Sequence, residues 1–543
     1  MSKIPFKRFG VMPDLSRNAV MDIPTLKRFA KTISEMGYNT LLLYTEDTYE
    51  VPDEPFFGHQ RGRYSQDDIR ELVAYCETIG VEVIPCIQTL AHLECIFKWM
   101  EYKSTVLDTG NVLLAENERT YELIRNMLKS VKACYKSRVV HVGMDEAHLL
   151  GAGKYQNLHG SKSRFEILSK HLEIVCQMCR ELDLEPQIWG DMFFRMSHNG
   201  TYYVKQPKPD LEKIGTLPEN LSITAWDYYK LDRTMVHNMI AAHQKLGREV
   251  WYAGGIWTWK GYAPDNRFSI QCSKVSMEEC MKLGVENYFL TMWCEAGGGT
   301  SRFTGLPALW ACAQIAKGEK SKKAIAEGFE KKYGIPFHRF LDLDLNYAKK
   351  YDVAKGHSGN VCNPETYLLF NDPLMGKFDS AVNGTEVPLY KKLAKRLSKF
   401  QNDPEYGYLF RSQASLARTL TRKVDLTIRT RKAYLNGDKA AMKEILTKDY
   451  PYILKNLKDF ITNFRALWLF ENRPQGLEVQ EARLGGLYTR LVSCRARLQD
   501  WMDHDTPIPE LEEPVLEFRT KAQGTVNHRF KGAWADWITA GRT

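Results

Sequence analysis

The sequence predicts an α/β protein, a (β/α)8 TIM barrel followed by an all-α C-terminal domain. Eight short β-rich runs alternate with amphipathic helical patterns between residues 9 and 295, and a doubly wound sheet usually has fewer strands. Beyond about residue 320 these runs stop and long helical patterns replace them. We therefore expect a TIM barrel over 1–318 and a helical domain over 319–543.

The expected strands are runs rich in β-branched and aromatic residues that end in polar side chains. They cover 9–16, 39–47, 81–88, 139–146, 185–192, 221–228, 249–257 and 287–295. Apolar residues at helical spacing between them predict helices over 23–37, 67–80, 121–135 and 164–182. Because chemistry in this fold lies at the carboxyl ends of the strands, the ends of the eight runs hold the candidate site.

The C-terminal part is interpreted as a helical domain with apolar faces to cover. The expected helices span 408–435, 438–446, 452–472 and 477–502, and Gly- and Pro-bearing connectors over 356–388 indicate loops. The helices carry more apolar surface than a free-standing module needs. We expect them to pack on the barrel, and a homodimer interface is a second use for the same faces.

The composition is that of an ordinary globular chain and excludes several classes of protein. Of the 543 residues, 44% are hydrophobic and 26% are charged, which excludes a mostly disordered chain. No apolar run approaches the ~18 residues of a membrane-spanning helix. The start MSKIPFKRFG lacks the apolar stretch of a signal peptide. We expect no membrane association and a cytoplasmic location.

The cysteines and the basic residues indicate neither a metal site nor a nucleic-acid surface. The 12 cysteines are scattered, as in a reduced cytosolic protein, and the close pair Cys176 and Cys179 lacks the second Cys or His pair of a zinc site. The net charge of +9 comes from the part beyond residue 318. There it follows helical patterns such as LYKKLAKRLSKF (389–400), which is typical of solvated helix faces.

Carboxylates and tryptophans gather at the ends of the expected strands. The end residues are Asp14, Arg17, Glu46, Asp47, Gln88, His92, Asp145, Glu146, Trp189, Asp191, Trp226, Tyr228, Trp257, Trp293 and Glu295. Large aromatic rings at a barrel mouth are costly to expose, and they commonly stack on sugar rings. The pattern favours a carbohydrate site over simple core packing.

The segment VVHVGMDEAH (139–148) is the most informative one. It places adjacent Asp145 and Glu146 at a strand end, where repulsion and burial can raise the pKa of one carboxyl, as a general acid requires. The pair could instead cap the next helix. A metal-dependent hydrolase using His141, Asp145 and His148 is a second alternative, but it needs more ligands at other strand ends than the chain offers. A carbohydrate-binding barrel without activity is a third.

Motifs in strand order resemble one enzyme family. PDLSR (13–17), PCIQTLAHLE (85–94), HVGMDEAH (141–148) and the Trp293-Cys294-Glu295 motif are similar to glycoside hydrolase family 20, the exo-acting β-N-acetylhexosaminidases. The resemblance covers roughly residues 1–310. NRPQGLEVQEARLGGL (472–487) resembles the cytosolic branch, in which a helical domain follows the barrel.

The resemblance implies a retaining, substrate-assisted hydrolysis in which the 2-acetamido oxygen attacks the anomeric carbon to form an oxazolinium ion. It assigns Glu146 as general acid and then base, and Asp145 as the residue that orients the acetamide and stabilises its positive charge. No cofactor and no metal are implied. The expected substrates are terminal β-linked GlcNAc or GalNAc residues of oligosaccharides or glycoconjugates; GlcNAc against GalNAc, the linkage and the oligomeric state stay open.

The resemblance also assigns the residues that bind the sugar. Arg17 corresponds to the arginine on the 3- and 4-hydroxyls, and Glu295 to the carboxylate on O4 or O6. Asp47 corresponds to the acid after the second strand, with Glu46 as the alternative by register. The remaining assignments are His92 in the polar network, Trp189, Trp226 and Trp293 in the aromatic box, and Tyr228, or else Trp257, near the acetamide oxygen.

Overall fold

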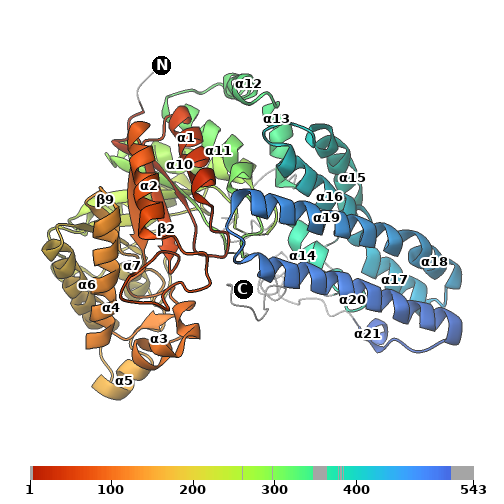
Figure 1. Ribbon diagram of the computed structural model, residues 1–543, viewed down its shortest axis with the longest axis horizontal. Coiled ribbons are helices and arrows are strands. Elements are labelled where there is room, and N and C mark those ends of the chain that lie inside the picture. Colours follow the sequence, from red (N-terminus) through yellow and green to blue (C-terminus); the bar gives the residue numbers. More distant parts are fainter. Residues whose placement is uncertain are drawn as a thin grey trace.

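A closed barrel with a group of helices along one side makes up the molecule (Figure 1). The computed structural model describes residues 4–259, 261–295, 297–345, 364–376, 378–379, 382 and 384–514. Within those ranges no helix is long and apolar enough to cross a membrane. The eleven cysteines in them are buried, and none forms a disulfide.

Eight parallel strands form the barrel, which confirms the predicted (β/α)8 fold. They are β1 (Arg8–Pro13), β2 (Thr40–Glu46), β3 (Glu82–Ile87), β6 (Val139–His141), β7 (Glu185–Trp189), β8 (Ser222–Trp226), β9 (Glu249–Gly255) and β10 (Asn287–Met292). Their order around the barrel is β1-β10-β9-β8-β7-β6-β3-β2. The pairing of β1 with both β2 and β10 closes it.

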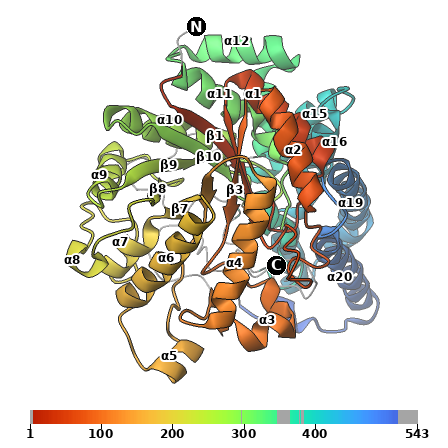
Figure 2. The same ribbon diagram turned by 60° about the vertical axis from the view of Figure 1, so that its left-hand side comes forward.

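Helices surround these strands (Figure 2). The main ones are α1 (Ile23–Met36), α2 (Gln66–Thr78), α4 (Glu118–Cys134), α6 (Arg164–Glu181), α9 (Arg233–Gln244), α10 (Asn266–Lys282) and α11 (Leu306–Ala316). Local signals set their ends: Asp22 caps α1 by accepting from the Thr25 amide, and Gly37 ends it at φ 111°. The four predicted helices match α1, α2, α4 and α6 within a few residues.

Two features of the barrel were not predicted. The strand expected over 139–146 ends at His141, because Gly143 and Met144 have left-handed backbone (φ 75° and 71°) and turn the chain into the carboxyl-end loop. A small hairpin of β4 (Leu107–Thr109) and β5 (Val112–Leu113) follows β3. Short helices fill the other loops at this end: α3 (Met100–Thr105), α5 (Lys154–His159), α7 (Asp191–Ser197) and α8 (Leu211–Ile214).

The described C-terminal part consists of helices joined by loops. Its helices are α12 (Lys322–Tyr333), α13 (Phe337–Phe340), α14 (Pro364–Phe370), α15 (Glu386–Leu397), α16 (Gly407–Lys423), α17 (Leu426–Leu435), α18 (Lys439–Glu444), α19 (Tyr450–Glu471), α20 (Leu477–His504) and α21 (Pro509–Glu512). The helix expected over 408–435 is two helices, α16 and α17. The loop expected over 356–388 contains α14 and the first residues of α15, and its residues 356–363, 377, 380, 381 and 383 lie outside the described ranges.

The helical part and the barrel share one continuous apolar core. Buried side chains of α1 and of the loop after β1 belong to the same cluster as those of α16, α19 and α20. The fit is tight, since a Cβ at Gly298 would lie 2.9 Å from the Trp468 ring of α19. Polar contacts also join the barrel to the helical part. The Tyr262 hydroxyl donates to Gln480 at 2.7 Å, and Arg473 pairs with Asp68 at 2.8 Å. The helices therefore cover a flank of the barrel, as expected from their apolar faces.

We predict that a fragment covering 1–318 will be insoluble or inactive. Cutting there uncovers the apolar flank that α19 and α20 bury, and a large exposed apolar patch promotes aggregation. Solubility, circular dichroism and thermal unfolding of the fragment beside the full chain measure this. A soluble 1–318 fragment with the full chain's unfolding temperature would contradict it, and sedimentation of the full chain tests the expected homodimer separately.

Candidate active site

A cavity opens at the carboxyl ends of the barrel strands. It encloses about 410 Å³ between atoms, open solvent at its mouth included, and is called the carboxyl-end cavity below. Its walls are Arg17, His92, Asp145, Glu146, Trp189, Trp226, Tyr228, Tyr229, Trp293 and Glu295. Of the residues predicted for the site, the structure brings all but Asp47 to this one cavity.

The backbone after β6 places two adjacent carboxyl groups in the cavity. Gly143 is needed there, because at φ 75° a Cβ would lie 2.0 Å from the Gln88 side-chain oxygen. Gln88 accepts from the Met144 amide at 3.2 Å and donates to Asp145 at 2.8 Å. Glu146 also has left-handed backbone, at φ 48°. Such conformations are costly for residues with side chains and cluster at functional sites.

Asp145 is buried and held as a carboxylate. Its second oxygen lies 3.3 Å from His92 Nε2. Burial favours the neutral carboxyl, but His92 and the Gln88 hydrogen bond outweigh it and lower the pKa of Asp145 to about 2. Burial likewise opposes a charge on His92, yet Asp145 raises the pKa of His92 to about 9. The two side chains thus form a buried ion pair beside Glu146, whose carboxylate lies 3.9 Å from His92.

Glu146 is held by an arginine that the sequence analysis missed. Arg195 on α7 donates to Glu146 Oε1 at 2.8 Å and to Asp191 Oδ2 at 2.8 Å, and the same Asp191 oxygen accepts from the Glu146 amide at 3.2 Å. Burial and the neighbouring Asp145 charge raise the pKa of Asp191 to about 7, against the opposing charge of Arg195. The spacing of Asp191 and Arg195, four residues apart on a helical pattern, was the available signal.

Arg17 lies in a cluster of charges and rings at the end of β1. Its guanidinium donates to Asp14 at 2.7 Å and lies 3.1 Å from Glu46. It also faces the rings of Tyr44 and Trp293, at 5.4 and 5.3 Å. Although burial opposes the charge, Glu46 and Asp14 hold the pKa of Arg17 well above its ordinary value. The side chain is therefore a fixed cation at the cavity wall.

Asp47 does not line the cavity. It is buried and pairs with Arg61 at 3.3 Å, and Arg61 in turn donates to Asn18 at 2.8 Å. Glu46, the alternative by register, is the acid that contacts Arg17. The register shifts between Tyr44 and Glu46 where β2 pairs with β3, and this bulge decides which of the two acids faces inward.

Aromatic rings form most of the remaining wall. Trp189 lies against His141 and Trp293, with ring centres 4.4 and 5.9 Å apart, and Trp226 stacks on Tyr228 at 5.2 Å. The Tyr228 hydroxyl forms a hydrogen bond with the Trp293 side chain. Three tryptophans and two tyrosines thus contribute to the cavity wall.

Two of the residues weighed for the site take other positions. Trp257 packs behind the wall, where it stacks on Trp259 at 4.3 Å and donates to the Tyr228 carbonyl at 2.8 Å. His141 is buried, accepts from the Gly143 amide at 3.1 Å, and burial lowers its pKa to about 3. Within the described ranges no group of three or more His, Cys, Asp or Glu side chains is placed to hold a metal ion.

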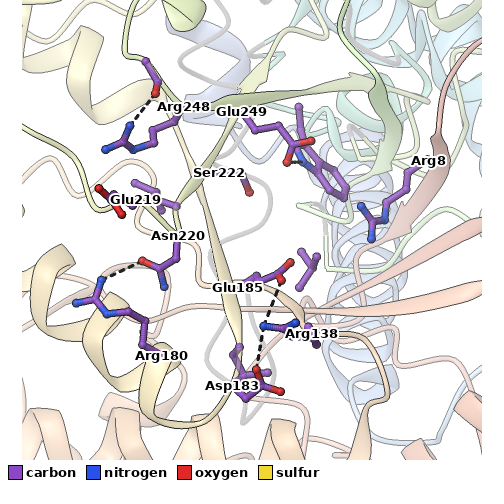
Figure 3. Close-up of a pocket in the computed structure, with 15 residues that line it drawn as sticks. Arg8, Arg138, Arg180, Asp183, Glu185, Glu219, Asn220, Ser222, Arg248 and Glu249 are labelled. Atoms are coloured by element: carbon purple, nitrogen blue, oxygen red, sulfur yellow. Dashed lines mark hydrogen bonds and ion pairs between the residues drawn. The ribbon is translucent and has the colours of Figure 1, made fainter.

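A larger hollow lies at the opposite end of the barrel, around the first residues of β1, β6, β7, β8 and β9 (Figure 3). Its arginines already have partners: Arg138 pairs with Asp183 at 2.9 Å, and Arg180 donates to Asn220 at 3.2 Å. Side chains at the amino ends of barrel strands serve stability rather than chemistry. The carboxyl-end cavity is therefore the candidate active site.

Comparison with protein families identifies the class. Residues 6–245 match the catalytic domain of glycosyl hydrolase family 20, and residues 339–530 match the glycoside hydrolase 20C C-terminal domain. The barrel and its matched catalytic domain define a glycoside hydrolase. Within that class, the chain belongs to family 20, with the C-terminal domain of its 20C group.

Individual relatives cover only part of the chain. Hexosaminidase D of Bos taurus is 28% identical over 207 residues, 36% of this chain and 55% of the relative. Hexosaminidase D of Homo sapiens is 24% identical over 266 residues, 46% and 51% of the two chains. The match thus spans about half the length of these curated relatives. A solved family 20 exo-β-N-acetylglucosaminidase from Vibrio harveyi has a TM-score of 0.48 at 15% identity, over 62% of this chain and 58% of that one.

The pair of His92 and Asp145 predicts a dependence of stability on pH. The pKa of His92 is about 9 in the folded chain and ~6.5 when unfolded. Its protonated form therefore stabilises the fold fully below the unfolded value, and this contribution is lost as pH rises through the folded value. Between about pH 7 and pH 10, the stability advantage of wild type over His92→Gln should shrink by on the order of 2 kcal/mol.

Urea unfolding of both proteins across that range measures the difference. His171→Gln is a matched control, because burial lowers the pKa of this second buried histidine to about 4 and leaves it neutral throughout. Its stability difference from wild type should be flat. A flat difference for His92→Gln as well would show that His92 carries no charge in the folded chain.

Proposed function

We propose that the chain is an exo-acting β-N-acetylhexosaminidase that removes terminal nonreducing GlcNAc or GalNAc with retention of configuration. The carrying observation is the adjacent pair Asp145 and Glu146 in a cavity walled by Trp189, Trp226 and Trp293. The family match and the names of the relatives support the same activity.

In the first step the substrate supplies its own nucleophile. The 2-acetamido oxygen attacks the anomeric carbon and the bond to the leaving oxygen breaks, while Glu146 transfers its proton to that oxygen. The product is an oxazolinium ion with positive charge spread over the former amide. Asp145, fixed as a carboxylate by His92 and Gln88, faces that charge and stabilises it without reorganisation.

In the second step Glu146, now a carboxylate, takes a proton from water. The resulting hydroxyl attacks the anomeric carbon, the oxazolinium ring opens, and the acetamide is restored with the β configuration. Arg195 donates to Glu146 Oε1 at 2.8 Å and holds the carboxyl group in place. Asp191 holds Arg195 in that position.

The remaining wall residues bind the sugar. Arg17 presents a fork of donors that suits neighbouring hydroxyls O3 and O4, and Glu295 accepts from O4 or O6. Trp189, Trp226 and Trp293 enclose the N-acetyl group and the ring face. Tyr228 is the proposed donor to the acetamide oxygen. Asp47 lies behind the cavity wall, where it pairs with Arg61 and does not contact the sugar.

The substrates would be terminal β-linked N-acetylhexosaminides of oligosaccharides or glycoconjugates, met in the cytoplasm. A reducing compartment agrees with the eleven buried thiols of the described ranges. The mechanism uses only side chains and the substrate's acetamide, so it needs no cofactor.

A substrate screen tests this function. We expect hydrolysis of p-nitrophenyl β-GlcNAc or β-GalNAc, insensitivity to a chelator, and almost no action on the plain β-glucoside, which lacks the internal nucleophile. A GlcNAc-thiazoline, which mimics the oxazoline, should bind far better than GlcNAc. Equal rates on the glucoside, or weak thiazoline binding to an active enzyme, would exclude substrate assistance.

Glu146→Gln should show a loss that depends on the leaving group. An amide cannot donate the proton, so kcat should fall by on the order of 10²–10⁴ fold on an alkyl or sugar aglycone, and much less on an acidic phenol. Asp145→Asn is the matched control, because it makes the same change one residue away. Its kcat should fall by on the order of 10²–10³ fold on both substrates, because the oxazolinium cation must be stabilised whatever the leaving group. Similar losses of Glu146→Gln on both substrates would remove its role as acid.

A further inference from the structure

The turn that carries Glu295 is held from two sides. The Gly297 amide donates to the Cys294 carbonyl at 3.1 Å, which closes a tight turn with Glu295 in it. On the barrel side, the Cys294 amide donates to Asp14 at 3.0 Å. On the other side, Gln480 of α20 donates through its amide to the Gly297 carbonyl at 2.8 Å. One of the two hydrogen bonds that fix the turn therefore comes from the helical domain.

The contact with α20 is close and specific. Gly297 has left-handed backbone at φ 72°, and a Cβ there would lie 2.9 Å from Arg483 Nη1. Gln480 is fully buried, and its own oxygen accepts from the Tyr262 hydroxyl at 2.7 Å. Both ends of the Gln480 amide are thus used, one to fix the side chain and one to hold the turn. A buried amide fixed in this way has one available orientation.

The same end of α20 also contacts the segment that carries Arg17. A Cβ at Gly476, just before α20, would lie 2.6 Å from the Asn18 Cβ and carbonyl oxygen. Asn18 adjoins Arg17 and accepts from Arg61 at 2.8 Å. Figure 1 shows α19 and α20 meeting the barrel at the ends that their short connection joins. Two side chains of the carboxyl-end cavity, Arg17 and Glu295, therefore stand on segments that contact this connection or the first turns of α20.

We propose that Gln480 is a positioning residue for sugar binding, and that the helical domain sets the affinity for the sugar's outer hydroxyls through it. Gln480 does not line the cavity; it acts by fixing the turn that presents Glu295. This inference rests on the proposed function, in which Glu295 accepts from O4 or O6. It gives the helical domain a part in the reaction besides covering the apolar flank of the barrel.

Gln480→Met tests the proposal, because it keeps the length of the side chain and removes both hydrogen bonds. We expect KM for the p-nitrophenyl N-acetylhexosaminide to rise on the order of three- to tenfold, the usual worth of one hydrogen bond, with kcat within about twofold. Gln480→Glu, which keeps an acceptor for Tyr262 and loses the donor to Gly297, serves as a second variant if the first folds poorly. Tyr262→Phe is the comparison variant: it removes the other bond to Gln480 and keeps the donor to Gly297, so its KM should rise less than that of Gln480→Met.

A double-mutant cycle separates positioning from general loosening. In a Glu295→Gln background, Gln480→Met should no longer raise KM, because both changes act through one carboxylate. If the two effects multiply instead, Gln480 does not act through Glu295 and the proposal fails. A wild-type KM for both Gln480 variants would also overturn it.

Hydrogen exchange gives a readout that does not depend on activity. The backbone amides of 297–301 should exchange several-fold faster in Gln480→Met than in wild type or Tyr262→Phe. Unchanged exchange would show that Gln480 does not hold the turn. If wild type has no hexosaminidase activity, the function proposed above falls, and with it the affinity role of Gln480, whereas the exchange result still decides whether Gln480 fixes the turn.

Discussion

The buried charge of Asp145 is the constraint on which the carboxyl end of the barrel depends. A carboxylate out of water is costly unless it is paired and hydrogen-bonded. Here His92 supplies the pair and Gln88 the hydrogen bond, and each comes from the segment after β3 while Asp145 follows β6. Since β3 and β6 are neighbours in the barrel, the closure of the sheet brings the charge and its partners together. Glu146, the next residue, therefore has a fixed position beside the Asp145 carboxylate.

Backbone strain accompanies this arrangement. Glu46, His92, Met144 and Glu146 all have positive φ, and all four follow or end barrel strands at the same rim. Each such residue costs on the order of 1 kcal/mol or more, so the surrounding contacts must hold it in place. Their apolar neighbours, such as Leu93, Val142 and Ala147, pack in a second cluster of buried side chains that come from the barrel and its loops. Packing within the barrel thus stabilises the strained rim around the acid pair.

The sequence predicts well which segments are strands and helices, but it predicts poorly which way individual side chains point. Strands and helices have different hydrophobic periods, so the eight alternating units can be recognised and indicate a barrel. The family motifs then place Asp145, Glu146 and the tryptophans at one rim. The choice between Glu46 and Asp47 is different, because a single-residue bulge in β2 reverses which side chain faces inward. Arg195 was missed for a related reason: it follows the strand end by one helical turn, and only the start of α7 at Asp191 aims it back at Glu146. The break between α16 and α17 likewise has no clear signal in an unbroken helical pattern.

The closure of the barrel also explains how one helix can contact the segments of two cavity side chains, Arg17 and Glu295. Arg17 follows the first strand and Glu295 the last, yet β1 and β10 pair along their whole length. Asp14 joins the two segments directly, since it accepts from the Cys294 amide, 280 residues away, and from Arg17. A helix packed where β1 meets β10 therefore contacts both segments at once, whereas at the β1–β2 or the β9–β10 boundary it would meet only one of them. The helical domain therefore contacts the segments of Arg17 and Glu295, while the acid pair after β6 is held by its own neighbours, His92, Gln88 and Arg195.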